Sequence, residues 1–258
     1  MERSFSHIDG DYFQASLIPE IRAIVEDSKA NLGVERQSFE KLIPQSQTEI
    51  HARQDMGFSD YMVAFSGLSK SYCVGIVDMV NSTKISASLN EKEWCKYYTV
   101  FLNSMSKILQ KFGGQAIKNG GDSLLYYFPE YVASSNIGFL NCIESGLSMI
   151  ESQPLISTIL HQEGLPPLSY RVSLDFGKVV IMKQSNSFSI DLIGPPVNMC
   201  AKINHKALPN GMVIGGDLHE LVKEMKEYRF KAVSGLSIGL KHTYPIYEVC
   251  RKTNGYSA

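Results

Sequence analysis

From residue 71 onward, short runs of β-forming residues alternate with helical segments, and some of these runs follow each other directly. The first run, YCVGIVDMV at 72–80, is apolar and predicts a buried strand. After Asn90, apolar side chains recur at helical spacing until a pair of glycines ends the pattern. Two further runs, at 115–119 and 123–128, are separated only by Gly-Gly-Asp, which predicts a tight antiparallel hairpin. Strands joined by direct hairpins indicate an α+β fold, with a central, mostly antiparallel sheet flanked by helices.

The rest of this region continues the mixture of strands and helices, whereas the first 70 residues differ from it. The further predicted elements are a short helix capped by Asn81-Ser82-Thr83 and ending near Leu89, a helix over 132–151, a hairpin over 169–184, a helix over 197–207, a strand over 212–216, a helix over 217–225 and strands over 228–233 and 244–249. Near the N-terminus we expect an amphipathic helix over 12–28 and a weaker one over 34–43, while 44–70 shows no clear pattern. The chain therefore divides into a helical N-terminal extension, 1–70, and a larger domain, 71–258.

Composition and charge exclude several classes of protein. The 258 residues carry Lys+Arg 25 against Asp+Glu 26, and this balance gives no reason to expect binding to nucleic acid. Hydrophobic residues make up 44% of the chain, which is too many for a disordered protein. No run of about 18 apolar residues is available for membrane insertion, and the N-terminus lacks the apolar run of a signal peptide. Five cysteines without a CxxC pair fit reduced core thiols, so we expect a cytoplasmic protein.

Two aspartates occupy positions where predicted strands end. Asp78 lies inside the otherwise apolar run, and Asp122 lies in the Gly-Gly-Asp turn. Taken singly, Asp78 is better explained as a strand-end carboxylate bonded to backbone N–H groups, and Asp122 as an ordinary turn residue. Two carboxylates at the same end of a sheet would form a hard-oxygen site suited to Mg²⁺ or Mn²⁺. The spacing alone does not bring them together.

Four motifs, in order, resemble those of the class III nucleotidyl cyclase catalytic domain. They are VGIVDMVNST, KNGGDSLLYYFP, LDFGKVV and DLIGPPVNMCAKI, which begin at residues 74, 118, 174 and 191. Any one of them is weak evidence, whereas four in the family's order, within a compatible series of strands and helices, are strong. The resemblance covers about 71–250 and implies the family's ferredoxin-like fold.

The resemblance implies that Asp78 and Asp122 bind two metal ions, Mg²⁺ or Mn²⁺, and that the backbone carbonyl of Met79 adds a ligand. In the family, one ion lowers the pKa of the ribose 3′-hydroxyl and the other neutralises the triphosphate. The 3′-oxygen attacks the α-phosphorus and pyrophosphate leaves, which gives a 3′,5′-cyclic monophosphate. The expected activity is therefore that of a nucleotidyl cyclase.

Base recognition resembles the adenylate-type pattern of the family. Lys118, four residues before Asp122, fills the place of the purine-reading lysine, and Asp191, seven residues before Asn198, fills that of its partner. A lysine donor and an aspartate acceptor suit adenine, whereas guanylate-type enzymes usually carry Glu and Cys at these places. We therefore expect ATP as substrate. Outside this motif frame, Lys118 would be an ordinary exposed strand lysine and Asp191 a turn former.

The resemblance assigns further residues around the predicted helix at 197–207. Asn198 would orient the ribose, and four residues later the family has an arginine that stabilises phosphate charge in the transition state. This chain has Lys202 there, which keeps the charge but lacks the planar fork, so we expect slower turnover or a shifted substrate. Lys241 sits about where the family places a triphosphate-binding lysine, and Lys183 is a weaker candidate. For both, an ordinary exposed lysine is the alternative.

In the family, the metal-binding aspartates come from one protomer and the base-reading residues from the other. This chain holds both sets, so the resemblance implies a homodimer with two shared sites and an inactive monomer. Two alternatives to an adenylate cyclase stay open. One is a pyrimidine cyclase that makes cyclic UMP or CMP as an anti-phage signal, which the Lys118/Asp191 pair opposes and Lys202 permits. The other is a degenerate cyclase domain that binds nucleotide or a partner without turnover, which only Lys202 supports.

Overall fold

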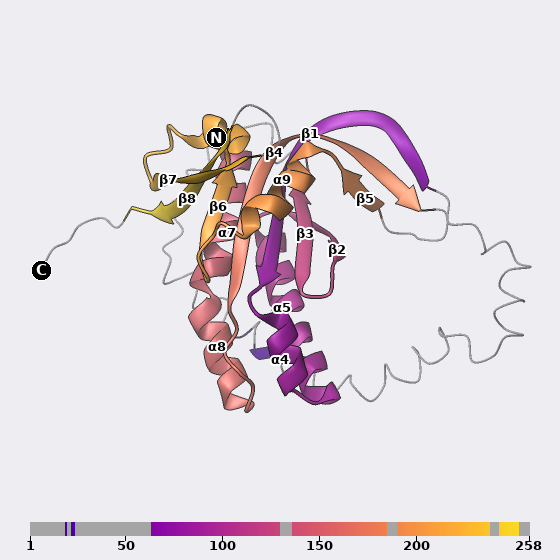
Figure 1. Ribbon diagram of the computed structural model, residues 1–258, viewed down its shortest axis with the longest axis vertical. Coiled ribbons are helices and arrows are strands. Elements are labelled where there is room, and N and C mark those ends of the chain that lie inside the picture. Colours follow the sequence, from indigo (N-terminus) through magenta and orange to yellow (C-terminus); the bar gives the residue numbers. More distant parts are fainter. Residues whose placement is uncertain are drawn as a thin grey trace, which may run out of the picture.

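The computed structural model describes residues 63–129, 136–184, 190–237 and 243–252, together with residues 19, 22 and 23. Its centre is an eight-stranded sheet (Figure 1). The strands are β1 (Val63–Met79), β2 (Gln115–Asn119), β3 (Ser123–Phe128), β4 (Tyr170–Gln184), β5 (Ile190–Ile193), β6 (Met212–Gly215), β7 (Tyr228–Ser237) and β8 (Thr243–Arg251). The helices are α4 (Ser82–Ser88), α5 (Glu91–Lys111), α7 (Asn136–Glu151), α8 (Gln153–Gln162), α9 (Pro195–Asn204) and α10 (Gly216–Val222). None of the helices in these ranges combines the length and apolar content that a membrane span needs.

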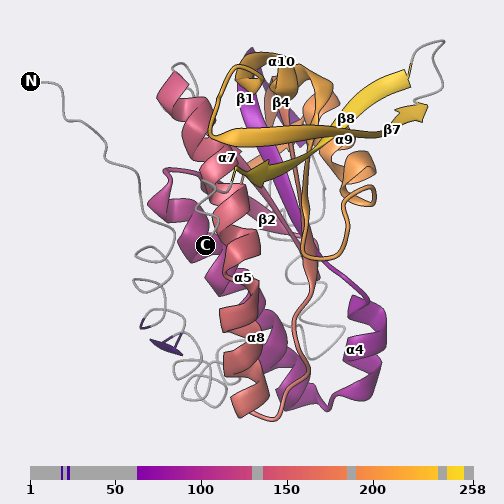
Figure 2. The same ribbon diagram turned by 90° about the vertical axis from the view of Figure 1, so that its left-hand side faces the viewer.

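The strands follow the order β2-β3-β1-β4-β6-β8-β7, and β5 pairs with β4. The β4–β6 pair is parallel, and the other pairs are antiparallel. The two long strands β1 and β4 form the centre, and their pairing extends from Met79 opposite Tyr170 to Val63 opposite Gln184. Helices α5, α7 and α8 lie on one face of the sheet and α9 on the other (Figure 2). This is the α+β arrangement that the sequence predicts.

Alternating side chains of β1 contribute to a separate core on each face of the sheet. Cys73 and Val77 belong to the larger core, which α5, α7 and α8 cover. Val74 belongs to a second core, which Cys200 of α9 covers. Gly75 leaves no room for a side chain, because a Cβ there would lie 2.3 Å from Cζ of Tyr126. Burial on both faces explains why this strand reads as a nearly continuous apolar run.

Helix α5 follows the signals in its sequence. The Asn90 side chain accepts a hydrogen bond from the Glu93 N–H, and the Glu93 carboxylate accepts one from the Asn90 N–H, which completes a capping box. Gly113, with φ of 79°, follows the C-terminal end of the helix. The buried face consists of Tyr97, Val100, Phe101, Ser104, Met105, Ile108 and Leu109. Burying one large apolar side chain contributes about 1.5–3 kcal/mol, so this face fixes α5 against the sheet.

Four elements differ from the prediction, and one of them is β5, a strand over Ile190–Ile193 that is not predicted from the sequence. The hairpin predicted over 169–184 is wrong, because these residues form the single strand β4, which pairs with β1 along most of its length. Gly177, which reads as a turn, lies inside that strand and faces Pro196 of α9. Helix α8 is not predicted, and its Pro154 lies in the first turn, where a missing N–H costs no helical hydrogen bond. Strand β1 begins at Val63, within the stretch that shows no clear pattern.

The predicted N-terminal helices, over 12–28 and 34–43, lie outside the described residues except for residues 19, 22 and 23, which are helical. Strand β1 crosses the predicted boundary at residue 70, and the division into an extension and a larger domain stays a prediction. The cytoplasmic location and the lack of a nucleic-acid partner also stay predictions.

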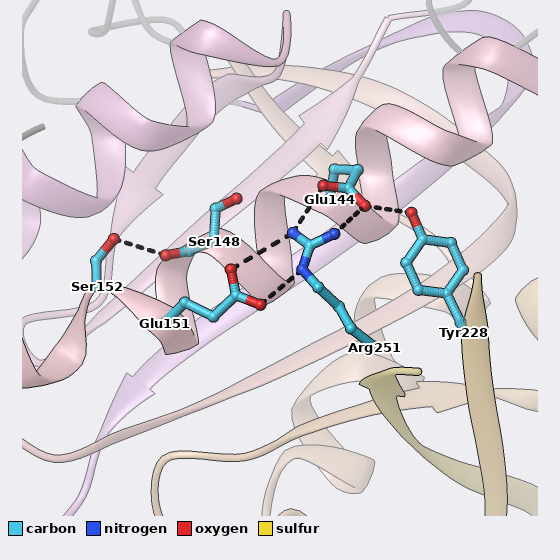
Figure 3. A network of polar contacts seen from close by, with 6 residues as sticks. All are labelled: Glu144, Ser148, Glu151, Ser152, Tyr228 and Arg251. Carbon is cyan, nitrogen blue, oxygen red and sulfur yellow. Dashed lines mark hydrogen bonds and ion pairs between the residues drawn. The ribbon is translucent and has the colours of Figure 1, made fainter. Parts of the chain in front are cut away.

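An ion-pair network fastens the last strand, β8, to α7 (Figure 3). Arg251 donates to both carboxylate oxygens of Glu144, with N–O distances of 2.5 and 2.7 Å, and its Nε lies 2.7 Å from Oε1 of Glu151. The hydroxyl of Tyr228, at the start of β7, also donates to Glu144. One guanidinium therefore serves two carboxylates of the same helix, and the fork geometry makes these charge-assisted hydrogen bonds strong.

A second polar contact ties β4 to β8, although β6 lies between them. Asp175 of β4 is 1% exposed. Its carboxylate accepts hydrogen bonds from the Tyr244 hydroxyl, at 2.9 and 3.0 Å, and from the Phe176 N–H, at 2.9 Å. Burial raises the pKa of Asp175 to about 6, and the hydrogen bonds from Phe176 and Tyr244 oppose this rise.

Candidate active site

The two predicted metal ligands lie close to each other. Asp78 lies near the C-terminal end of β1, and Asp122 lies in the β2–β3 turn, directly before β3. Asp78 is the last but one residue of β1 and pairs with Ser123 of β3. The residues next to them are also joined, because the Met79 N–H donates to the main-chain carbonyl of Asp122 at 2.9 Å. Both aspartate side chains are half-buried. Antiparallel pairing thus brings together two residues that are far apart in sequence.

The two carboxylates affect each other electrostatically. The pKa of Asp78 is raised, first by its partial burial and second by the negative charge of Asp122. The charges of His205 and Arg171 oppose this rise. Arg171 is the β4 residue paired with Asp78, and His205 follows the last turn of α9. The packing of β4 and α9 therefore places Arg171 and His205 near Asp78. Sequence reasoning missed both residues.

The start of α4 holds the Asp122 side chain. Asp122 follows Gly120 and Gly121, and Gly121 has φ of 86°, which favours glycine. The Ser82 hydroxyl donates to Oδ2 of Asp122 at 2.5 Å. Asn81 occupies the N-cap position of the predicted helix, but it adopts the left-handed conformation and its side chain makes no capping hydrogen bond. The sequence predicts the neighbouring Ser82 only as part of the helix cap. In the structure, Ser82 is the residue whose hydroxyl contacts the Asp122 carboxylate.

The donor set at Asp78 and Asp122 fits a small, hard cation. Carboxylate oxygens suit Mg²⁺ or Mn²⁺, and a cation between the two side chains would relieve their repulsion. Throughout the described ranges, no cluster of three or more His, Cys, Asp or Glu side chains could hold a metal ion. Two carboxylates leave the other positions of Mg²⁺ to water and substrate phosphates, as is usual at nucleotide sites. The Met79 carbonyl as a further ligand stays a prediction.

The predicted base-reading residues form an ion pair. Nζ of Lys118, on β2, lies 2.5 Å from Oδ2 of Asp191, on β5. The other carboxylate oxygen of Asp191 accepts a hydrogen bond from the Leu192 N–H at 2.8 Å. The Lys118 side chain is 54% exposed and the Asp191 side chain is 14% exposed. The carboxylate is therefore held by its neighbours, while the lysine stays open to a ligand.

Helix α9 presents Asn198 and Lys202 at a surface hollow. Both residues are exposed and lie one turn apart. The hollow has a volume of about 370 Å³ and is lined by Gly194, Pro195, Asn198, Met199 and Lys202. A Cβ at Gly194 would lie 2.5 Å from the Lys178 carbonyl, so glycine allows α9 to begin this close to β4.

Buried polar groups fix α9 on the sheet. The amide of Asn204, a residue 2% exposed, donates to the carbonyls of Ile76 and Arg171 at 3.3 and 3.4 Å. It also donates to Oγ of Ser173 at 3.2 Å, and the Ser173 hydroxyl donates to the Cys200 carbonyl at 3.0 Å. These contacts join the helix to both β1 and β4. Sequence reasoning missed Asn204 and Ser173, because their partners lie 27 to 128 residues away.

The structure describes the predicted site residues at three places of one chain: the carboxylates of Asp78 and Asp122, the Lys118–Asp191 ion pair, and Asn198 with Lys202 on α9. Among the residues that the structure describes, no hydrogen bond or ion pair joins the carboxylates of Asp78 and Asp122 to Lys118 or Lys202. Lys241 lies outside the described residues. The backbone of Lys183 pairs with Ile190 of β5, and its side chain lies outside the described part. The roles of both lysines stay predictions.

A family model for the adenylate and guanylate cyclase catalytic domain matches residues 68–249. The match covers most of the chain and includes every site residue that the sequence predicts. The chain therefore belongs to this family, and the resemblance noted in the sequence is confirmed.

Individual relatives are distant. An adenylate cyclase of Streptomyces coelicolor is 22% identical over 147 residues, which are 57% of this chain and 33% of that protein. The chain thus spans about one third of this relative's length. The structure of the guanylyl cyclase Cya2 gives a TM-score of 0.66 at 19% identity and covers 74% of this chain and 97% of that one. The adenylyl cyclase CyaB from P. aeruginosa gives 0.65 at 20% identity, with 72% and 97% covered. These similarities show the fold. The similar structures include both an adenylyl cyclase and a guanylyl cyclase.

Proposed function

We propose that this protein is a homodimeric nucleotidyl cyclase that converts ATP into 3′,5′-cyclic AMP and pyrophosphate. The observation that carries the choice of ATP is the 2.5 Å ion pair between Lys118 and Asp191. Adenine offers ring nitrogens that accept hydrogen bonds and an exocyclic amine that donates them, which matches a lysine and an ionised aspartate. Guanine presents a carbonyl oxygen in place of that amine, so a carboxylate acceptor at the same position would be mismatched.

Each protein group then has a task in the reaction. Asp78 and Asp122 hold the divalent cations, which when bound lower the pKa of the 3′-hydroxyl and neutralise charge on the triphosphate. The 3′-oxygen bonds to the α-phosphorus, the bond from the α-phosphorus to the bridging oxygen breaks, and the hydroxyl proton passes to solvent as pyrophosphate leaves. Asn198 orients the ribose, and Lys202 offsets negative charge on the phosphates. Positioning and electrostatic stabilisation supply most of the rate acceleration.

A second copy of the chain completes the site in this proposal. Asn198 and Lys202 are exposed on α9, which suits residues that act on a substrate held largely by another protomer. A twofold axis would bring α9 of one protomer to the carboxylates of its partner and would do so twice, giving two sites. A monomer would then be inactive.

Lys202 favours a second candidate, a pyrimidine cyclase that makes cyclic UMP or cyclic CMP. An ammonium binds phosphate as a point charge and does not fix its orientation, whereas an arginine fork does. A triphosphate held this way tolerates a different placement of the nucleoside. The Lys118–Asp191 pair argues for ATP over this candidate.

A nucleotide panel tests both candidates. The purified full chain is incubated with ATP, GTP, CTP or UTP in the presence of Mn²⁺, and the products are identified by mass spectrometry. Light scattering measures the molar mass of the protein and so its oligomeric state. We expect cyclic AMP from ATP, a dimer, and no product from Asp122→Asn. A folded dimer that makes no cyclic product from any of the four would overturn the proposal, and bound nucleotide without product would indicate a binding module. Cyclic UMP or CMP would establish the second candidate.

A further inference from the structure

The hydroxyl of Ser82 makes a contact that the proposed reaction has not yet used. Ser82 is the first residue of α4 and is 8% exposed. Its Oγ lies 2.5 Å from Oδ2 of Asp122, 40 residues along the chain. A hydroxyl that donates to an ionised carboxylate forms a short, charge-assisted hydrogen bond, about twice as strong as one between neutral groups. The contact therefore holds the orientation of one of the two carboxylates.

The surroundings explain why Asp122 requires such a partner. Gly120 and Gly121 precede it in the turn, and Gly121 has a positive φ. Glycine has more backbone freedom than any other residue, so these two glycines by themselves do not fix the Asp122 side chain. The main chain of Asp122 is fixed by the Met79 N–H, at 2.9 Å. The side chain is fixed by Ser82, three residues beyond Met79. The segment that follows Asp78 therefore orders both parts of Asp122 and sets the second carboxylate relative to the first.

We propose that Ser82 is a positioning residue for the divalent cation: by binding one oxygen of Asp122, it directs the other toward the ion shared with Asp78. The inference rests on the proposed function in that it takes these carboxylates as the metal ligands. Groups that orient metal ligands typically change metal affinity by about 10- to 100-fold when removed. Without the hydroxyl, the Asp122 carboxylate rotates among orientations of which only some face Asp78, and binding weakens accordingly.

The same helix provides a matched control. The hydroxyl of Ser86, one turn later in α4, lies 3.0 Å from the Tyr98 hydroxyl and does not contact Asp122. Ser86→Ala removes the same atom from the same helix and deletes one hydrogen bond. Ser82→Thr keeps a hydroxyl at the position and tests whether that group, rather than the shape of the residue, matters.

Mn²⁺ binding provides a readout that does not depend on turnover. Free Mn²⁺ is titrated with the purified full chain and followed by electron paramagnetic resonance, with circular dichroism to verify folding. We expect Ser82→Ala to raise the dissociation constant about tenfold, with Ser86→Ala and Ser82→Thr within about twofold of wild type. Unchanged binding by Ser82→Ala would overturn the inference, and so would wild-type binding no tighter than that of Asp122→Asn. If Ser82→Ala does not fold, Ser82→Cys, whose thiol is a weak donor, must weaken Mn²⁺ binding while Ser82→Thr does not.

The binding assay and the nucleotide panel separate this inference from the proposed function. If the wild type binds Mn²⁺ more tightly than Ser82→Ala and yields no cyclic nucleotide, the positioning role stands and the cyclase proposal fails. If the wild type makes a cyclic nucleotide and Ser82→Ala binds Mn²⁺ equally well, the cyclase proposal stands and the positioning role fails.

Discussion

The ammonium of Lys118 lies 2.5 Å from the carboxylate of Asp191, and this single ion pair joins the edge strand β2 to β5, which itself pairs with β4. More than half of the Lys118 side chain is exposed. A pair this open to solvent contributes less than about 1 kcal/mol to the free energy of unfolding. Under the proposed function, the pair serves base recognition, and its small contribution to stability is consistent with that role.

Removing either member of this pair is expected to damage base recognition and leave folding intact. Lys118→Ala and Asp191→Ala should each lower kcat/KM for ATP by about 10- to 100-fold, the effect of one charged hydrogen bond, and lower that for GTP much less. Steady-state kinetics with both nucleotides measures the effect. Lys231→Ala, which breaks an exposed ion pair with Glu248 on β8, serves as the control. Equal losses for ATP and GTP would show that the pair does not read the base.

Restoring an arginine at position 202 is expected to speed the reaction. Lys202→Arg should raise kcat for ATP by about tenfold, because a planar fork grips two phosphate oxygens where an ammonium offers a point charge. Single-turnover kinetics separates this gain from changes in product release. Lys206→Arg, two residues beyond the end of α9, makes the same chemical change outside the hollow and should leave kcat as it is. A lower kcat for Lys202→Arg would indicate a site built around lysine.

Burial of Asp175 is expected to make stability depend on pH. Its pKa is about 6 in the folded chain, against an ordinary value of 3.8, so well below pH 3.8 both states are protonated and burial carries no charge penalty. As pH rises from about 4 to about 6, the unfolded chain ionises first, and the free energy of unfolding falls by about 3 kcal/mol. Denaturant unfolding across this range should show the fall in wild type and lose it in Asp175→Asn. A fall of equal size in that variant would assign the pH dependence to other groups.

Loss of Arg251 is expected to destabilise the fold without touching the chemistry. Arg251→Met leaves Glu144 and Glu151 as neighbouring negative charges without their shared partner, which should cost about 2 kcal/mol of unfolding free energy. Chemical denaturation gives this value, and the kcat of the folded fraction should not change. Arg251→Lys keeps the charge but loses the fork, so its cost should lie between. As a control, Lys223→Ala breaks the exposed ion pair with Glu220 and should have no measurable effect.

Local signals in the sequence were sufficient for several elements. Asn90, the helical repeat of apolar residues after it and the glycines after Phe112 predict α5 with its ends, and the structure adds the capping box at Asn90. The Gly-Gly-Asp turn predicts the β2–β3 hairpin. These signals suffice because the groups that satisfy each other lie within a few residues. The motif spacing likewise predicts Lys118 and Asp191 as a pair, which the structure joins.

Other features were settled by contacts between distant segments. The hairpin prediction places a turn at Gly177, yet β4 continues through it because β1 offers partners on both sides of this residue and the glycine gives Pro196 room to pack. Helix α8 begins one residue after α7 ends, and the sequence analysis, which ends the preceding helix at 151, does not predict it. The length of a strand is set by its neighbours in the sheet, and these are not visible in its own residues.

The sequence by itself determined the residue types of the site, its family and the local elements that carry it, because each depends on chemistry or spacing within a short segment. Only the tertiary structure decided that Asp78 and Asp122 meet, that Arg171 and His205 stand beside them and that the Ser82 hydroxyl holds Asp122. The same holds for the Asp175–Tyr244 contact and for the Arg251 network, whose members come from separate strands and helices. The physical reason is that orientation and burial of a polar group depend on which distant surfaces pack against it, and packing is a property of the whole fold.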